Sequence, residues 1–85
     1  MTQIRKQQEL LRKADVLKQY EVYGYRIAYY MLKNETLATK AATQALIELF
    51  HTDDFFHLAP FTQKHITKKV FIKQSLITKA SVIGR

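Results

Sequence analysis

The sequence YEVYGYRIAYYMLKNE, at residues 20–35, carries the strongest structural signal in this chain. It is rich in residues that favour strands, yet its apolar positions are three and four residues apart, as on one face of a helix. The same spacing continues toward the N-terminus and predicts a helix over about residues 7–33. The apolar positions of this face are Leu10, Ala14, Leu17, Tyr20, Gly24, Ile27 and Met31.

Gly24 lies in the middle of this predicted helix. A glycine weakens a helix by up to about 1 kcal/mol relative to alanine, so a bend or a break is one alternative at this position. The other, which we favour, is that a neighbouring helix approaches closely there. Tyr20, Tyr23 and Tyr30 are expected on the core face of the helix.

A second helix is predicted over about residues 35–51. Asn34 suits its N-cap, because the side-chain oxygen can accept a hydrogen bond from a free amide of the first turn. Small residues on one face predict close contact with another helix. The residues of this face are Ala38, Ala42, Ala45 and Leu49.

A third helix is predicted over about residues 60–80, with residues 81–85 fraying at its end. Pro60 suits the first turn, because backbone N–H groups there have no partner within the helix and the N–H that proline lacks is not needed. The apolar residues 55–58 before it are expected to form a loop or a short helical turn against the core. The predicted buried face of the third helix consists of Ile66, Val70, Leu76, Ile77 and Ala80.

The chain has 85 residues, of which 47% are hydrophobic, and it contains two glycines and one proline. So few turn residues argue against a β-sandwich or barrel. We expect one all-α domain over residues 1–85, a small bundle of three helices, with four helices as the alternative. The chain has no cysteine, which excludes disulfides and thiolate ligands and favours a cytoplasmic location. No run reaches the roughly 20 apolar residues of a membrane span.

Side chains suited to catalysis are sparse. His51, His57 and His65 do not have the i, i+4 spacing of metal ligands on a helix. Asp53 and Asp54 are adjacent and suit a turn or a cap better than acid–base chemistry. No glycine-rich phosphate loop or nucleophile motif is present. We therefore expect no enzymatic activity, no cofactor and no metal site.

Positive charge is concentrated in the last third of the chain. The net charge is +7, and residues 55–85 contain six Lys or Arg and no acid. A helix face that is merely solvated usually carries both positive and negative side chains. Because this segment carries only positive ones, we favour a nucleic acid as its partner. Aromatic residues lie among the lysines, as in proteins that stack unpaired bases, although amphipathic helices also bring the two types together by chance. The candidate DNA-binding residues are Lys64, Lys68, Lys69, Phe71 and Lys73, with Phe61 as a second aromatic residue in the same pattern.

Together, YEVYGYRI at residues 20–27, MLKNE at 31–35 and LATKAATQALIELF at 37–50 resemble the beginning of region 2 of bacterial sigma factors, especially the extracytoplasmic-function group. Those proteins carry a tyrosine–glycine–arginine motif, an Asn-Glu pair and a Thr-Gln pair at this spacing. The resemblance covers about two-thirds of the chain.

The resemblance implies a transcription regulator that docks on RNA polymerase core through its second helix and recognises or opens promoter −10 DNA through its third. It places polymerase contacts at Gln44, Thr43 and Glu48. The family's acidic positions are occupied here by Lys40, Ala41 and Ala45. That change implies that a companion protein supplies the missing contacts.

The chain is also too short for the second DNA-binding domain of a sigma factor. It therefore corresponds to an excised region 2, a degenerate relative, or a co-sigma protein with a separate sigma-like partner. The alternative from another class is a helical protein–protein interaction module, forming homo- or hetero-oligomers, without a role in nucleic-acid binding.

Overall fold

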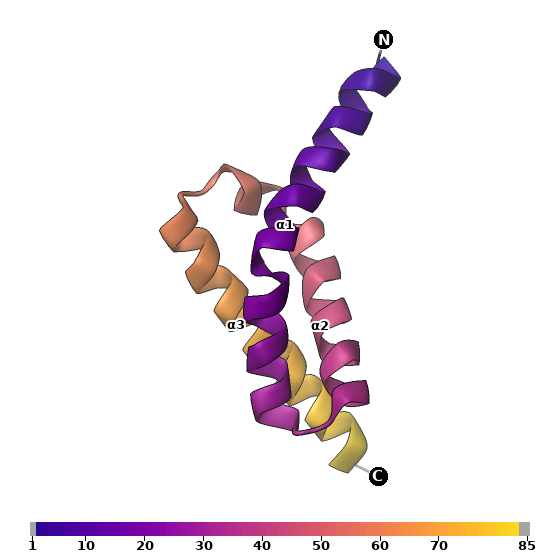
Figure 1. The fold of residues 1–85 in the computed structure, drawn as a ribbon, viewed down its shortest axis with the longest axis vertical. Helices are drawn as coiled ribbons and strands as arrows, with labels where there is room; N and C mark the ends of the chain where they lie inside the picture. Colours follow the sequence, from indigo (N-terminus) through magenta and orange to yellow (C-terminus); the bar gives the residue numbers. More distant parts are fainter. Residues whose placement is uncertain (1, 84–85) are drawn as a thin grey trace.

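A computed structural model describes residues 2–83, and the side chains from Lys6 onward. This part of the chain forms three α-helices and one 3-10 helix: α1 (Thr2–Leu32), α2 (Glu35–Phe50), η1 (Asp53–His57) and α3 (Pro60–Ile83). Each α-helix packs against the other two, and the first turns of α1 project beyond the bundle (Figure 1). The expected all-α, three-helix fold is confirmed.

The helix bounds differ from the prediction mainly at the two ends. The first helix begins five residues earlier than predicted, at Thr2. The third continues to Ile83, three residues beyond its predicted end, and residues 84–85 lie outside the described part of the chain. Leu10 and Ala14 are exposed, because this part of α1 has little of the bundle beside it.

The turn between α1 and α2 has the predicted N-cap. Lys33 adopts the left-handed conformation, with φ of 54°, and reverses the chain. The Oδ1 atom of Asn34 then accepts a hydrogen bond from the Leu37 amide at 2.9 Å. Glu35 follows in the first turn, where its negative charge interacts favourably with the positive end of the helix dipole and stabilises the helix.

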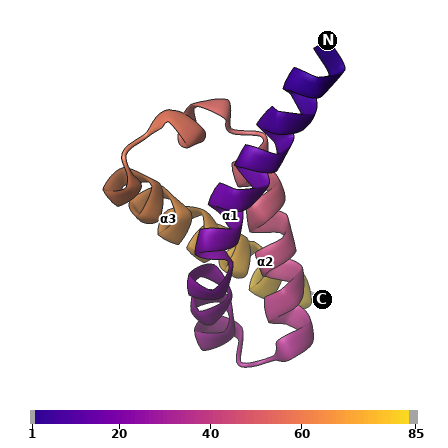
Figure 2. The same cartoon turned by 45° about the horizontal axis from the view of Figure 1, so that its top comes forward.

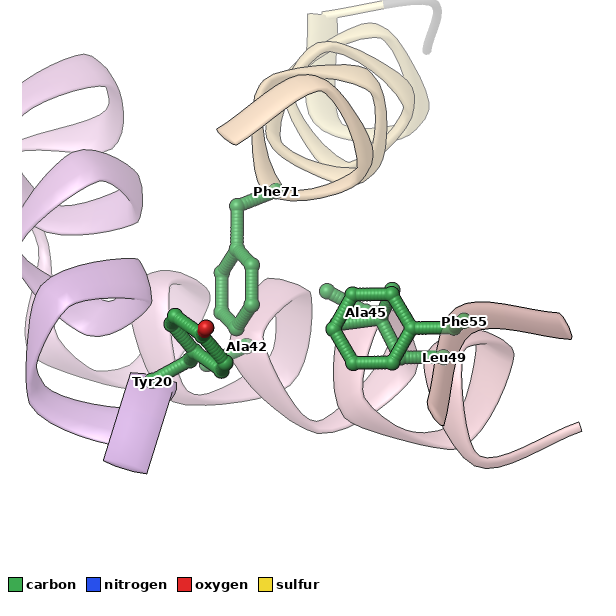
Figure 3. Packing of buried hydrophobic residues seen from close by; sticks show 6 residues of the cluster. All are labelled: Tyr20, Ala42, Ala45, Leu49, Phe55 and Phe71. Atoms are coloured by element: carbon green, nitrogen blue, oxygen red, sulfur yellow. The ribbon is translucent and has the colours of Figure 1, made fainter. Parts of the chain in front are cut away.

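The main core lies where all three helices and η1 meet (Figure 3). Phe71 points from α3 toward Tyr20 of α1 and Ala42 of α2. A β-carbon at position 24 would overlap the Phe71 ring. The expectation of a close helix approach at Gly24 is therefore confirmed, and α1 runs through this residue without a break. The buried members of the cluster are Tyr20, Ala42, Ala45, Leu49, Phe55 and Phe71.

The segment that joins α2 to α3 contains η1 and can be followed in Figure 2. Polar contacts hold it against the helices. Phe55 of η1 is fully buried, as expected for a helical turn against the core. Its carbonyl accepts from Nε2 of Gln63 at 3.1 Å, and the Tyr20 hydroxyl donates to Oε1 of Gln63 at 3.0 Å. Burial raises the pKa of Tyr20. On the outside, Lys13 of α1 forms an ion pair with Asp53 at 3.0 Å.

The buried face of α3 is not the one that its apolar spacing predicts. Leu76 and Ile77 are 53% and 54% exposed, Ala80 is exposed, and Ile66 and Val70 are only partly buried. The helix instead turns Phe71 inward, because Gly24 and the α2 alanines leave room for the ring. Polar residues share that face, and the Thr67 hydroxyl is satisfied by the Gln63 carbonyl. The residues of the buried face are Gln63, Thr67, Phe71, Ser75 and Thr78.

Candidate nucleic-acid interface

A groove runs between α1 and α3 on one side of the bundle. One hollow of about 500 Å³ is lined mainly by apolar side chains, with Arg26 and Lys68 among them. A second hollow of about 270 Å³ adjoins it and shares Tyr23 and Lys68. We call the two together the α1–α3 groove. Its lining residues are Tyr23, Arg26, Ile27, Tyr30, Met31, Phe61, Lys64, His65, Lys68 and Ile72.

Cations lie over aromatic rings in this groove and next to it. The Lys64 ammonium lies 5.0 Å from the centre of the Tyr23 ring, and that of Lys33 lies 4.7 Å from the centre of the Tyr30 ring. Phe61 is 86% exposed and Tyr30 is 74% exposed. Carboxylates are absent from the lining residues. Such a surface suits a ligand with flat apolar groups joined by anionic groups, which is the chemistry of a nucleic-acid strand.

The predicted DNA-binding lysines lie in three different settings. Lys64 and Lys68 line the α1–α3 groove. Lys69 is exposed on α3 next to Lys68. Lys73 points toward α2 and pairs with Glu48. The structure therefore brings two of these four lysines together with exposed aromatic rings.

The assignment of Phe71 to DNA binding is wrong. Its side chain has no exposed surface, because the ring fills the space over Gly24 in the core. A buried ring cannot stack on a base without unfolding of the bundle. Phe61, the other aromatic residue of the predicted pattern, is the one that the fold exposes beside Lys64.

The predicted polymerase-binding residues are divided between two sides of α2. Thr43 lines a separate hollow of about 370 Å³ between α1 and α2, and its hydroxyl donates to the Thr39 carbonyl at 2.8 Å. Gln44 is exposed to solvent. Glu48 points toward α3. Gln44 and Glu48 are four residues apart and therefore lie on neighbouring turns of one side of α2, whereas Thr43 lies beside α1. Thr43 and Gln44 are both exposed, and Glu48 is partly buried.

Glu48 joins α2 to α3. Its Oε2 atom accepts from the Lys73 ammonium, and its Oε1 atom accepts from Nε2 of Gln74 at 2.8 Å. Partial burial alone raises the pKa of this carboxyl, but the hydrogen bonds from Lys73 and Gln74 and the charge of Lys73 together lower it below its ordinary value. Glu48 is therefore held as a carboxylate.

Sequence reasoning missed the contribution of α1 to the groove. Tyr30 was expected on the core face but is exposed, and Tyr23 is only partly buried. Both lie on the side of α1 that faces α3, with Arg26 between them. The spacing of Tyr23, Arg26 and Tyr30 by three and four residues is the signal that could have identified this face.

Among residues 2–83, no three potential metal-ligating side chains come close enough to hold an ion. In the same part of the chain, no helix combines the length and the apolar character that crossing a bilayer requires. The described residues thus form a small helical domain with a groove that is lined by cationic and aromatic side chains. Comparison of the chain with protein-family models, with curated proteins and with solved structures gives no match in any of the three.

Proposed function

We propose that this protein is a transcription regulator that resembles sigma-factor region 2, docks on RNA polymerase and helps to recognise or open promoter −10 DNA. In this proposal a partner protein contributes the second DNA-binding domain of a sigma factor, and the protein acts in the cytoplasm. The observation that carries the proposal is the α1–α3 groove, in which exposed aromatic rings lie among cations. The motif resemblance at residues 20–50 supports the choice of promoter DNA and polymerase.

In this proposal the DNA strand follows the groove along α3. Arg26, Lys64 and Lys68 hold its phosphates, and the rings of Tyr30 and Phe61 stack on its bases. Stacking needs bases that are not already stacked in a duplex, so the groove favours melted DNA. The exposed side of α2, with Gln44 at its centre, is left for polymerase.

A single-stranded DNA of about 12 nucleotides should bind more tightly than the same sequence in a duplex, since site sizes of about 4–16 nucleotides are typical of such surfaces. Fluorescence anisotropy measures both affinities, which should fall as salt increases because bound lysines release counterions from the phosphates. Phe61→Ala should weaken single-strand binding by about fivefold or more, through lost stacking. Equal affinity for the two DNA forms would contradict a role in holding melted DNA.

Gln44→Ala should reduce the amount of RNA polymerase that co-purifies with the tagged protein from a bacterial lysate. Gln44 is exposed, so truncating its side chain should leave the core of the bundle unchanged. Thr36→Ala, at an exposed position about two turns earlier on α2, is the control and should leave polymerase recovery unchanged. Recovery of polymerase that is equal in wild type and Gln44→Ala would remove Gln44 from the proposed contact.

A second candidate function is protein–protein interaction, and the exposed apolar residues near the two ends of the molecule favour it. Such residues commonly mark contact surfaces when they cluster. A stable dimer at micromolar concentration in sedimentation velocity, without affinity for DNA or polymerase, would support this candidate over the first. The residues concerned are Leu10 and Leu11 on α1 and Leu76, Ile77, Val82 and Ile83 on α3.

A further inference from the structure

Glu48 and Lys73 bring together two surfaces that the proposed function keeps separate. Glu48 belongs to α2, which carries the proposed polymerase contact, and Lys73 belongs to the lysine-rich helix α3. Both carboxylate oxygens of Glu48 are used on α3, one by Lys73 and the other by Gln74. A cation that would otherwise be available to phosphate is thus neutralised by a carboxylate of the same chain.

The pair lies at the surface, where ligands can reach both members. The side chain of Lys73 is 53% exposed and that of Glu48 is 32% exposed. Lys69 lies one turn before Lys73 on α3, so a released Lys73 would form a pair of exposed lysines with it on this side of the helix. Ion pairs with this degree of exposure are weak, which means that a phosphate can displace the carboxylate.

We propose that Glu48 is an autoinhibitory residue that competes with nucleic-acid phosphate for Lys73. The inference rests on the proposed function, since it needs DNA to bind beside α3. A cationic group of a protein partner that pairs with Glu48 would release Lys73 and strengthen DNA binding. By reciprocity, DNA that binds Lys73 frees Glu48 and strengthens the contact with that partner by the same factor.

The test measures binding of a fluorescein-labelled single-stranded DNA of about 12 nucleotides to the full chain. Glu48→Gln removes the charge but keeps the shape of the side chain and an oxygen that can accept from Gln74. We expect it to raise the affinity about two- to fivefold, the range that corresponds to an exposed ion pair. The slope of log affinity against log salt should become steeper by about 0.7, as for one added phosphate contact to a single strand.

Two comparisons separate this mechanism from a general effect of charge. Glu35→Gln removes the same charge from an exposed position on the same helix and should raise the affinity less than Glu48→Gln. In a Lys73→Gln background, Glu48→Gln should give no gain beyond that of Glu35→Gln. An equal gain from the two glutamate variants, or a gain from Glu48→Gln that persists without Lys73, would overturn the proposal.

Lys68→Gln distinguishes failure of this inference from failure of the proposed function. Lys68 lines both hollows of the α1–α3 groove and forms no ion pair with Glu48. If Lys68→Gln weakens binding while Glu48→Gln changes nothing, the DNA surface stands and the autoinhibitory contact is refuted. If neither substitution changes the affinity, the groove does not bind DNA and both proposals fail.

Discussion

Phe71→Ala is expected to lower the free energy of unfolding by about 3–5 kcal/mol, the range for truncating a buried phenylalanine. The ring is fully buried and belongs to the core cluster that joins all three α-helices and η1. Small domains have total stabilities of about 5–15 kcal/mol, so this loss would bring the chain close to unfolding at room temperature. Urea denaturation followed by circular dichroism measures the change.

Phe61→Ala is the matched control, because it removes the same side chain from the same helix at a position that is 86% exposed. Its effect on stability should stay within about 0.5 kcal/mol. Gly24→Ala tests the other side of the contact. It should destabilise by about 1–3 kcal/mol despite the better helix propensity of alanine, because the added methyl group meets the Phe71 ring. Equal stability of the two phenylalanine variants would contradict an orientation of α3 that turns Phe71 inward.

Replacing Arg26, Lys64 and Lys68 together by glutamine is expected to weaken single-stranded DNA binding by about 10- to 100-fold at low salt. These three cations line the α1–α3 groove, to which α1 contributes one and α3 two. Because the variant no longer neutralises three phosphates, the slope of log affinity against log salt should fall by about 2. Anisotropy titrations at several salt concentrations measure both quantities.

The control for this variant removes the same amount of charge from other surfaces. Lys6, Lys18 and Lys40 are exposed, lie outside the groove and can be replaced by glutamine together. This control should lose much less affinity than the groove variant, since it changes only the long-range field of the protein. Similar losses in the two triple variants would mean that net charge, and not the groove, attracts the DNA.

The local structure of this protein follows from short-range chemistry and could be predicted closely. The spacing of apolar residues around Tyr20 indicates a helix despite the many strand-forming side chains. Asn34 ends one helix and begins the next, because its side chain accepts the Leu37 amide. Pro60 begins α3, where its missing N–H costs nothing. Each of these features depends only on residues within a few positions of one another.

The orientation of α3 could not be predicted in this way. Ile66, Val70 and Ile77 are more apolar than most of the residues that are actually buried, so a pattern of hydrophobicity selects the wrong face. Gln63 is buried because Tyr20 and the Phe55 carbonyl, both outside α3, satisfy its amide. The prediction that Phe71 binds DNA is wrong for the same reason. The position of Phe71 among lysines in the sequence gives no information about the space that Gly24 leaves for its ring.

The sequence by itself determined the three helices, the N-cap at Asn34 and the basic character of the last third of the chain. Only the tertiary structure decided which aromatic residues and lysines share a surface. It places Tyr23, Arg26 and Tyr30 of α1 beside Lys68 of α3, and it pairs Lys73 with Glu48 of α2. The physical reason is that a helix face is chosen by fit against its neighbours, and the fit of Phe71 over Gly24 sets the rotation of α3.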